Sequence, residues 1–190
     1  TQKGTIVAGD AGGVSIAAAG AEGSDLSLKG QLSGYSVAGG KGGSLSLASD
    51  KIVIGSVSNP VGEGEPNPLV LDSSLFQRGG FADYRLTSNK SGLSVSEATQ
   101  VDFKVQNRVL NASAVGQKTG ADLTAFSQIE LLPEIARQSG SLELNLVLNA
   151  QHPATNSILD IGAGATLSAG VGGSVKLTSD TSILMNGTLS

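Results

Sequence analysis

Few residues of this chain are of types that do chemistry, and its carboxylates are the first to consider. Paired carboxylates catalyse glycoside hydrolysis, and two pairs here could do the same. Asp50 and Asp180 hold equivalent positions in a repeated stretch, where capping of a turn by the aspartate side chain is the alternative to catalysis. Glu63 and Glu65 share the proline-rich stretch 59–68, where solvation in a loop is the alternative. Neither pair has a basic cluster beside it to hold an acidic sugar.

The histidine and cysteine content and the glycine-rich motifs do not indicate a catalytic, metal-binding or phosphate-binding site. His152 is the sole histidine and lies in a Gln-His-Pro sequence, which predicts a solvated loop. With no cysteine and no second histidine, a zinc site lacks ligands, and no Gly-x-Ser-x-Gly elbow supports a serine nucleophile. The Gly-Gly-Lys-Gly-Gly run at 39–43 lacks the Gly-Lys-Ser/Thr ending of a phosphate loop. A strand pattern follows it rather than a helix, so we interpret it as a corner of the backbone.

The most polar and aromatic stretch contains Asp83, Tyr84 and Arg85. Exposed tyrosine and arginine are common at protein interfaces, which makes this stretch a candidate contact surface. The alternative is an ordinary strand with Phe81 and Leu86 pointing inward. No catalytic, cofactor-binding or metal-binding residue is assigned, and the binding residues stay unidentified.

Composition limits the class of protein. The chain has 190 residues, 39% of them hydrophobic, which is enough to bury a core, but four Phe, two Tyr and no Trp leave the packing to Leu, Ile, Val and Ala. Its 27 glycines favour many tight corners. A net charge of −4 with 12 scattered basic residues excludes the basic footprint of a nucleic-acid-binding protein. No apolar run approaches the ~20 residues of a membrane span, so membrane insertion is not expected.

The dominant periodicity is two, which is typical of half-buried strands. The stretches separated by Gly, Ser, Asn and Asp are 26–28, 45–47, 52–54, 93–95, 101–105, 142–148, 159–161 and 175–177. One short helix is expected over 131–140, with Pro133 in the first turn, Glu134 at the positive end, Arg137 near the last turn and Gly140 as the terminating residue. The fold class is therefore all-β with at most one short helix.

Repeats and turn residues favour parallel stacking over hairpins. Asp-Gly is absent and Asn-Gly occurs once, at 186–187, so two-residue hairpins are scarce. The octapeptide 43–50 returns at 173–180, an offset of 130, and 12–17 is a third version. A fourth, 25–28, precedes its counterpart by 19 residues, which suggests coils of roughly 20 residues and about seven to nine of them. These observations predict a parallel β-helix.

The expected organisation is a single β-helix segment, 1–190, excised from a longer protein. Insertions are expected at 59–68, 114–120 and 150–156. An extra-helical subdomain or insertion within 59–157 is an open alternative, because 76–140 could form further coils or a subdomain laid on the shaft.

Three stretches look like the coils of filamentous haemagglutinin-type exoproteins, large bacterial surface proteins exported by two-partner secretion. They are AGGVSIAAAG, GGKGGSLSLASDKIVIG and GAGATLSAGVGGSVKLTSDTSILMNGTLS, and the resemblance is strongest over 4–58 and 158–190. It implies a right-handed parallel β-helix that serves as a stalk or adhesive shaft on a Gram-negative cell. The family's secretion domain carries Asn-Pro-Asn motifs, which Asn59-Pro60 and Asn67-Pro68 do not complete, so an internal segment is favoured.

Two functional hypotheses follow. The first is a structural and adhesive segment at the cell surface, without cofactor, whose partners are the outer-membrane transporter during export and a host glycan or protein receptor. The second is a carbohydrate-active β-helix enzyme or glycan-binding domain. The low aromatic content counts against the second, because sugar binding usually recruits Trp or Tyr for stacking.

Overall fold

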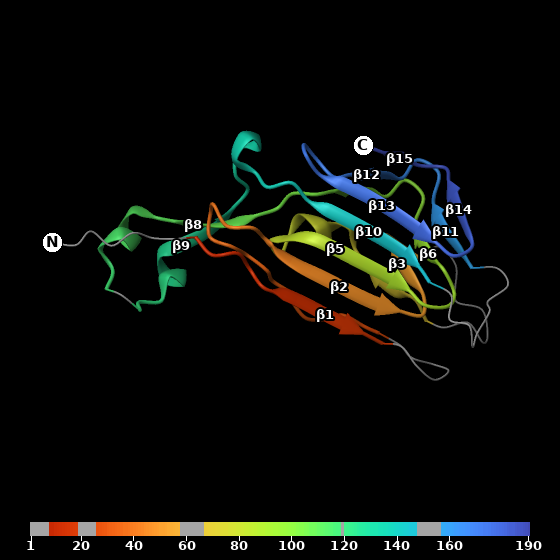
Figure 1. The fold of residues 1–190 in the computed structure, drawn as a ribbon, viewed down its shortest axis with the longest axis horizontal. Coiled ribbons are helices and arrows are strands. Elements are labelled where there is room, and N and C mark those ends of the chain that lie inside the picture. Colours follow the sequence, from red (N-terminus) through yellow and green to blue (C-terminus); the bar gives the residue numbers. More distant parts are fainter. Residues whose placement is uncertain (1–7, 19–25, 58–66, 119, 148–156) are drawn as a thin grey trace.

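The computed structural model describes residues 8–18, 26–57, 67–118, 120–147 and 157–190, which form an all-β fold of mostly parallel sheets. Sheet 1 contains β1 (Gly13–Ala17), β2 (Gly43–Ser49), β5 (Phe81–Ser88), β10 (Ser141–Leu146) and β13 (Ser174–Ser179), side by side in that order (Figure 1). Sheet 2 contains β4 (Leu69–Leu71), β3 (Ile52–Ile54), β6 (Leu93–Val95), β11 (Ile158–Ile161) and β14 (Ser182–Met185). Sheet 3 contains β7 (Gln100–Asp102), β12 (Thr166–Ser168) and β15 (Thr188–Leu189).

The chain visits these sheets in a fixed order. It runs from β5 through β6 to β7, from β10 through β11 to β12, and from β13 through β14 to β15, so each pass places one strand in each sheet. All pairings within the three sheets are parallel, as the scarcity of hairpin turns predicted. Strand neighbours in a sheet are therefore distant in sequence.

Aliphatic side chains stack in register between the sheets and form the core. On sheet 1 the partners are Val14, Leu45, Tyr84, Leu142 and Val175 in one row, and Ile16, Leu47, Leu86, Leu144 and Leu177 in the next. Sheet 2 contributes the rows Leu69, Ile52, Leu93, Leu159, Ile183 and Leu71, Ile54, Val95, Ile161, Met185. The members of these rows in the middle layers are almost fully buried, because each lies between the equivalent residues of the layers on either side.

The repeated octapeptides occupy equivalent places. The two copies, 43–50 and 173–180, supply β2 and β13 of sheet 1, and 12–17 supplies β1, each in the same register. The predicted equivalence of these three stretches is confirmed.

One level of the core is aromatic. Phe76, Phe81, Tyr84 and Phe103 are buried against one another, with ring centroids 4.9 to 6.0 Å apart and tilted or edge-on rings. The Tyr84 hydroxyl donates to the Leu75 carbonyl at 3.0 Å, which satisfies its polar end. The expectation of a purely aliphatic core is therefore wrong at this level.

The predicted coil length is wrong. Successive partners in sheet 1 are separated by 31, 39, 58 and 33 residues, from Val14 to Leu45, Tyr84, Leu142 and Val175. The segment 26–28, on which the 19-residue spacing rested, is not a strand. Its leucines pack against the core from outside the sheets. With five strands in sheet 1 of the described chain, seven to nine coils are too many.

The longest separation contains a projecting hairpin. Between β7 and β10, strands β8 (Asn107–Leu110) and β9 (Ser127–Glu130) form the one antiparallel sheet of the described residues, beyond the ends of the sheet 1 strands (Figure 1). The stretch 76–140 thus contains both strands of the main sheets and this hairpin. The expected insertion 114–120 overlaps it, whereas most of 59–68 and 150–156 lies outside the described residues.

Within the described ranges, helical structure is limited to short 3-10 turns. The described chain has four, η1 (Ser73–Gln77), η2 (Ala112–Gly116), η3 (Leu123–Phe126) and η4 (Glu134–Ala136). The expected helix over 131–140 is reduced to η4, and Gly140 leads directly into β10 instead of ending a helix. The prediction of at most one short helix is wrong. An Asp or Asn side chain, which accepts from the amide two residues on, initiates each of the other three.

Replacement of Leu47 by aspartate tests the core assignment. Leu47 is fully buried between Ile16 and Leu86, so an unpaired carboxylate there should lower the free energy of unfolding by about 4 kcal/mol or more. Ser46→Asp is the matched control, because Ser46 lies on the outer face of the same strand beside Arg85. Urea denaturation followed by circular dichroism measures both, and equal stabilities would contradict the assignment.

The absence of cysteine allows a direct test of the parallel register. Ser46 and Arg85 are partners on adjacent strands, so the double variant Ser46→Cys with Arg85→Cys should form a disulfide on mild oxidation. Ser46→Cys with Glu143→Cys places the thiols two strands apart and should stay reduced, because the strands are spaced by about 4.8 Å. Mass spectrometry distinguishes the two. Cross-linking of the control pair alone would contradict the register.

Candidate binding surface

The outer face of sheet 1 collects the polar side chains that alternate with the buried rows. One outward row contains Gly13, Ser44, Asp83, Ser141 and Ser174, and the next contains Ser15, Ser46, Arg85, Glu143 and Lys176. Because the strands are parallel and in register, residues from five separate parts of the chain become neighbours on one surface.

Glu143 connects two cations across three strands. Arg85 Nη2 lies 2.7 Å from Glu143 Oε2, and Lys176 Nζ lies 2.9 Å from Glu143 Oε1. The carboxylate side chain is 21% exposed, whereas the arginine and lysine side chains are 62% and 68% exposed. The group therefore presents its cationic ends to solvent and keeps its carboxylate lower on the sheet.

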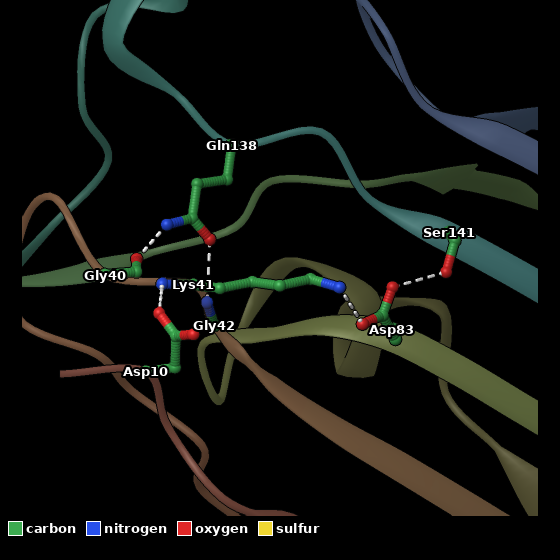
Figure 2. A network of polar contacts seen from close by, with 7 residues as sticks. All are labelled: Asp10, Gly40, Lys41, Gly42, Asp83, Gln138 and Ser141. Carbon is green, nitrogen blue, oxygen red and sulfur yellow. Dashed lines mark hydrogen bonds and ion pairs between the residues drawn. The ribbon is translucent and has the colours of Figure 1, made fainter.

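A second polar group lies where the strands begin (Figure 2). Lys41 Nζ is 2.6 Å from Asp83 Oδ2, and the Ser141 hydroxyl donates to Asp83 Oδ1 at 2.6 Å. The backbone amide of Lys41 donates to Asp10 Oδ1 at 2.6 Å. This group joins four layers of the fold, from the segment before β1 to β10.

Gln138 fixes the corner that carries Lys41. Its Oε1 accepts from the Gly42 amide at 2.7 Å, and its Nε2 donates to the Gly40 carbonyl, so one side-chain amide satisfies both backbone groups (Figure 2). Gly39 has a φ of +100°, which glycine adopts without strain. At Gly43 a Cβ would lie 2.5 Å from the Gly12 carbonyl oxygen of the neighbouring pass. The interpretation of 39–43 as a corner leading into a strand is confirmed.

A shallow groove of about 440 Å³ lies between these two polar groups. We call it the sheet 1 groove, and it is lined by Ser44, Leu45, Ser46, Asp83, Tyr84, Arg85, Ser141 and Glu143. Leu45 and Tyr84 have buried side chains, so they form its floor. The hydroxyls of Ser44 and Ser46 have no hydrogen-bond partner within the described ranges, which leaves them available to a ligand.

Both carboxylates of the groove are held in their ionised form. A hydrogen bond from Lys176 lowers the pKa of Glu143, and the charges of Arg85 and Lys176 lower it further, against the effect of burial. Burial raises the pKa of Asp83, but the hydrogen bonds from Lys41 and Ser141 and the charge of Lys41 outweigh it, so this pKa is also lowered. A glycosidase needs the opposite for its general acid, a carboxyl that keeps its proton near neutral pH.

The arrangement suits binding of an anionic, hydroxyl-bearing ligand. Lys41, Arg85 and Lys176 offer N–H donors beyond those used in their ion pairs, and Lys41 is 58% exposed. The serine hydroxyls and the carboxylates accept or donate to hydroxyl groups of a ligand. Among the described residues that line the groove, Tyr84 is the one aromatic residue, and its ring is buried beneath the sheet and so is not open for stacking.

The structure corrects part of the predicted contact surface. Asp83 and Arg85 point outward as expected, but Tyr84 is a core residue, and burial raises the pKa of its hydroxyl. Phe81 and Leu86 are buried, so the alternative of an ordinary strand is confirmed for the apolar side chains. The prediction that Tyr84 is exposed beside Arg85 is wrong, because alternation along the strand places positions 84 and 85 on opposite faces of the sheet.

The aspartates of the repeated octapeptides do not form a pair. Asp50 follows β2 and Asp180 follows β13, with β5 and β10 between them, so they lie three strand spacings, roughly 14 Å, apart. That is wider than the separation used by glycosidase carboxylates. Asp50 instead lies buried at the corner between sheets 1 and 2, where its carbonyl accepts from the Ser88 hydroxyl at 2.9 Å. Glu63, Glu65 and His152 lie outside the described residues.

Other functional chemistry finds no support in the parts of the chain that the structure describes. No group of three or more His, Cys, Asp or Glu residues there could hold a metal ion. No helix there is long and apolar enough to cross a membrane.

Sequence reasoning missed the residues that complete the surface. Ser141 and Glu143 alternate with the leucines of β10, and Lys176 lies between the apolar residues of β13, so their outward direction could have been found from the periodicity. Their pairing with Asp83 and Arg85 depends on a 58-residue register that no local signal gives. Gln138 carries no signal of its contacts with the corner.

Comparisons with known proteins do not assign the chain to a family. A scan against protein-family models finds no match, and searches of curated proteins and of solved structures return no similar protein. The residues of the chain itself therefore guide the functional interpretation.

Acid titration tests the charge network of the groove. Because the pKa of Glu143 is lower in the folded than in the unfolded chain, the unfolded chain takes up the proton first as the pH falls. The stabilisation by ionised Glu143 should be complete at neutral pH, and it should decline below about pH 4 as the carboxylate takes up a proton. Glu143→Gln should lower the free energy of unfolding at pH 7 by roughly 0.5 kcal/mol and flatten this decline.

The control for this titration is Glu97→Gln, which changes an exposed carboxylate outside the groove. Urea denaturation from pH 3 to pH 7 gives the free energies of unfolding. If the free energy of unfolding of Glu143→Gln falls with decreasing pH as steeply as that of the unmodified chain, the stabilising role of ionised Glu143 is contradicted.

Proposed function

We propose that this chain is a right-handed parallel β-helix that serves as a structural and adhesive segment of a large secreted bacterial surface protein. Three parallel sheets visited in a fixed order are what coiling of the chain about one axis would produce. Right-handedness is supported by the strong preference of crossover connections between parallel strands for that hand. The resemblance of 11–20, 39–55 and 162–190 to filamentous haemagglutinin-type exoproteins supports the same architecture.

The observation that carries this proposal is the continuity of the aliphatic rows. Leu47, Leu86 and Leu144 are fully buried on successive strands of sheet 1, and in sheet 2 the members of the rows from β4 to β11 are also buried. A stack held by its own rows is rigid and can be lengthened by repetition, which suits a shaft. The buried side chains thus supply the structural role, and the outer faces are left for contacts.

Adhesion is assigned to the sheet 1 groove. Its exposed cations and free serine hydroxyls fit a carboxylated or sulfated glycan of a host surface, and a protein receptor with an acidic patch is the alternative partner. Secretion to the cell surface through an outer-membrane transporter completes the proposal. No cofactor is needed for this role.

Glycan binding tests the adhesive role. The chain should bind acidic glycans on an array, and binding should weaken as salt increases. Arg85→Ala with Lys176→Ala should weaken it by roughly tenfold or more, since a hydrogen bond to a charged group contributes about 1.5 kcal/mol or more. Lys104→Ala removes a cation that pairs with Asp102 next to sheet 3, and it should leave binding unchanged.

The same measurements distinguish the alternatives. Binding to host cells without binding to any glycan would favour a protein receptor. Equal losses of glycan affinity in the double variant and in Lys104→Ala would contradict the assignment of glycan binding to the sheet 1 groove. Cleavage of polygalacturonate or a related polymer by the chain would favour the carbohydrate-active alternative over the adhesive one.

A further inference from the structure

The sheet 1 groove lies on the inner strands of its sheet. Its lining residues belong to β2, β5 and β10, and each of these strands pairs with another strand on both sides. Arg85 is the one cation among the lining residues, whereas Asp83 and Glu143 both line the groove as carboxylates. A ligand in the groove therefore meets one guanidinium close to two negative charges.

The register sets the neighbours of Arg85 on the outer face. Its partners are Glu143 on β10 and Ser46 on β2, each one strand spacing, about 4.8 Å, away. Asp83 lies two residues earlier on β5, roughly 7 Å along the same face. A hydroxyl and two carboxylates thus surround the guanidinium at distances comparable with the width of a sugar ring.

Arg85 keeps enough donors for one anionic group. Its Nη2 is 2.7 Å from Glu143 Oε2, and the guanidinium has further N–H groups on a largely exposed side chain. A single carboxylate can accept two of these N–H groups in a bidentate contact. A second anionic group on the same sugar would come close to Asp83 or Glu143, and the like charges would repel.

The rest of the groove suits uncharged sugar substituents. Asp83 is 38% exposed although it pairs with Lys41 and accepts from the Ser141 hydroxyl, so its carboxylate is within reach of a ligand (Figure 2). Carboxylates accept hydrogen bonds from hydroxyl and amide groups, and the hydroxyls of Ser44 and Ser46 both donate and accept. A neutral sugar would find partners here, whereas a sulfate would face carboxylates.

Long-range attraction gives a strongly anionic polymer little advantage at this surface. Lys41 and Lys176 lie beside the groove, where they pair with Asp83 and Glu143 at 2.6 and 2.9 Å. With Arg85 included, the three cations and two carboxylates carry a net charge of only +1. A surface that attracts polyanions instead presents many cations of one sign. Selection therefore depends on the local pattern of charge and hydroxyl groups.

We propose that the sheet 1 groove selects a glycan that carries one carboxylate on a sugar and only hydroxyl or acetamido groups on the neighbouring sugar. Arg85 binds the carboxylate, and Asp83 and Glu143 exclude heavily sulfated glycans. This inference rests on the proposed adhesive function, because it names the ligand class of the same site. Selectivity of this kind arises from repulsion of the wrong ligand as well as attraction of the right one.

Three hexasaccharides of equal length test the selectivity at physiological ionic strength. Hyaluronan carries a carboxylate on alternate sugars and no sulfate, heparin is heavily sulfated, and the oligomer of N-acetylglucosamine is neutral. Microscale thermophoresis with each labelled oligosaccharide gives its dissociation constant. The chain should bind the hyaluronan hexasaccharide roughly tenfold more tightly than either of the others, because heparin meets two like charges and the neutral oligomer lacks a group for Arg85.

Removal of the two carboxylates should reduce this preference. Asp83→Asn with Glu143→Gln should lower the ratio of hyaluronan to heparin affinity at least about fivefold, mainly through tighter heparin binding. Asp102→Asn is the matched control, because Asp102 pairs with Lys104 at 2.8 Å outside the groove and its loss should leave the ratio unchanged. Circular dichroism reports whether each variant is folded, and Glu143→Gln alone should change the ratio in the same direction.

The outcomes separate this inference from the proposed function. Heparin binding as tight as hyaluronan binding, or a ratio that the folded variants leave unchanged, would overturn the selectivity and leave the adhesive role intact. Equal binding of the neutral oligomer would overturn the assignment of the carboxylate to Arg85. Binding of none of the three would overturn both the selectivity and glycan adhesion through the groove.

Discussion

Parallel pairing in register is the constraint on which the rest of this structure depends. It spaces strands by about 4.8 Å and sets each residue beside its equivalent, so a leucine such as Leu86 is covered by Leu47 on one side and Leu144 on the other. A shift by one residue would turn these leucines to solvent and bring Arg85 and Glu143 into the core. Burial of the rows and the register therefore enforce each other.

The same register determines the outer face. Asp83 and Ser141 are 58 residues apart in sequence but are neighbours on adjacent strands, and Glu143 meets Arg85 for the same reason. Each ion pair on this exposed face contributes little to stability by itself. The arrangement of charges is thus a consequence of the packing beneath it, and it can vary for binding without loss of the core.

Sequence patterns predicted what is local and repeated. Seven of the eight stretches that were predicted from period-two alternation overlap a strand. The octapeptides 43–50 and 173–180 were correctly placed as equivalents, because a stacked layer imposes the same alternation each time. The length of a pass was not predictable, since the chain between sheets obeys no period and the hairpin of β8 and β9 extends one pass. The exposure predicted for Tyr84 was wrong. It was inferred from the polar hydroxyl of tyrosine, whereas the position of Tyr84 in the alternation of the strand places the side chain in the core.

The limits of local information also explain the contrast between the two sides of the stack. On one side, an irregular segment with leucines at 26, 28 and 32 covers sheet 2 although its alternation suggested a strand. On the other, Ile183 and Met185 continue the rows of sheet 2, yet nothing in the described chain covers them. Periodicity indicates which side chains point towards the core. The residues that cover those side chains are far away in sequence, so a local pattern does not predict them. The same apolar rows can therefore belong to an inner layer, where they are buried, or to the last layer of the described chain, where they are partly exposed.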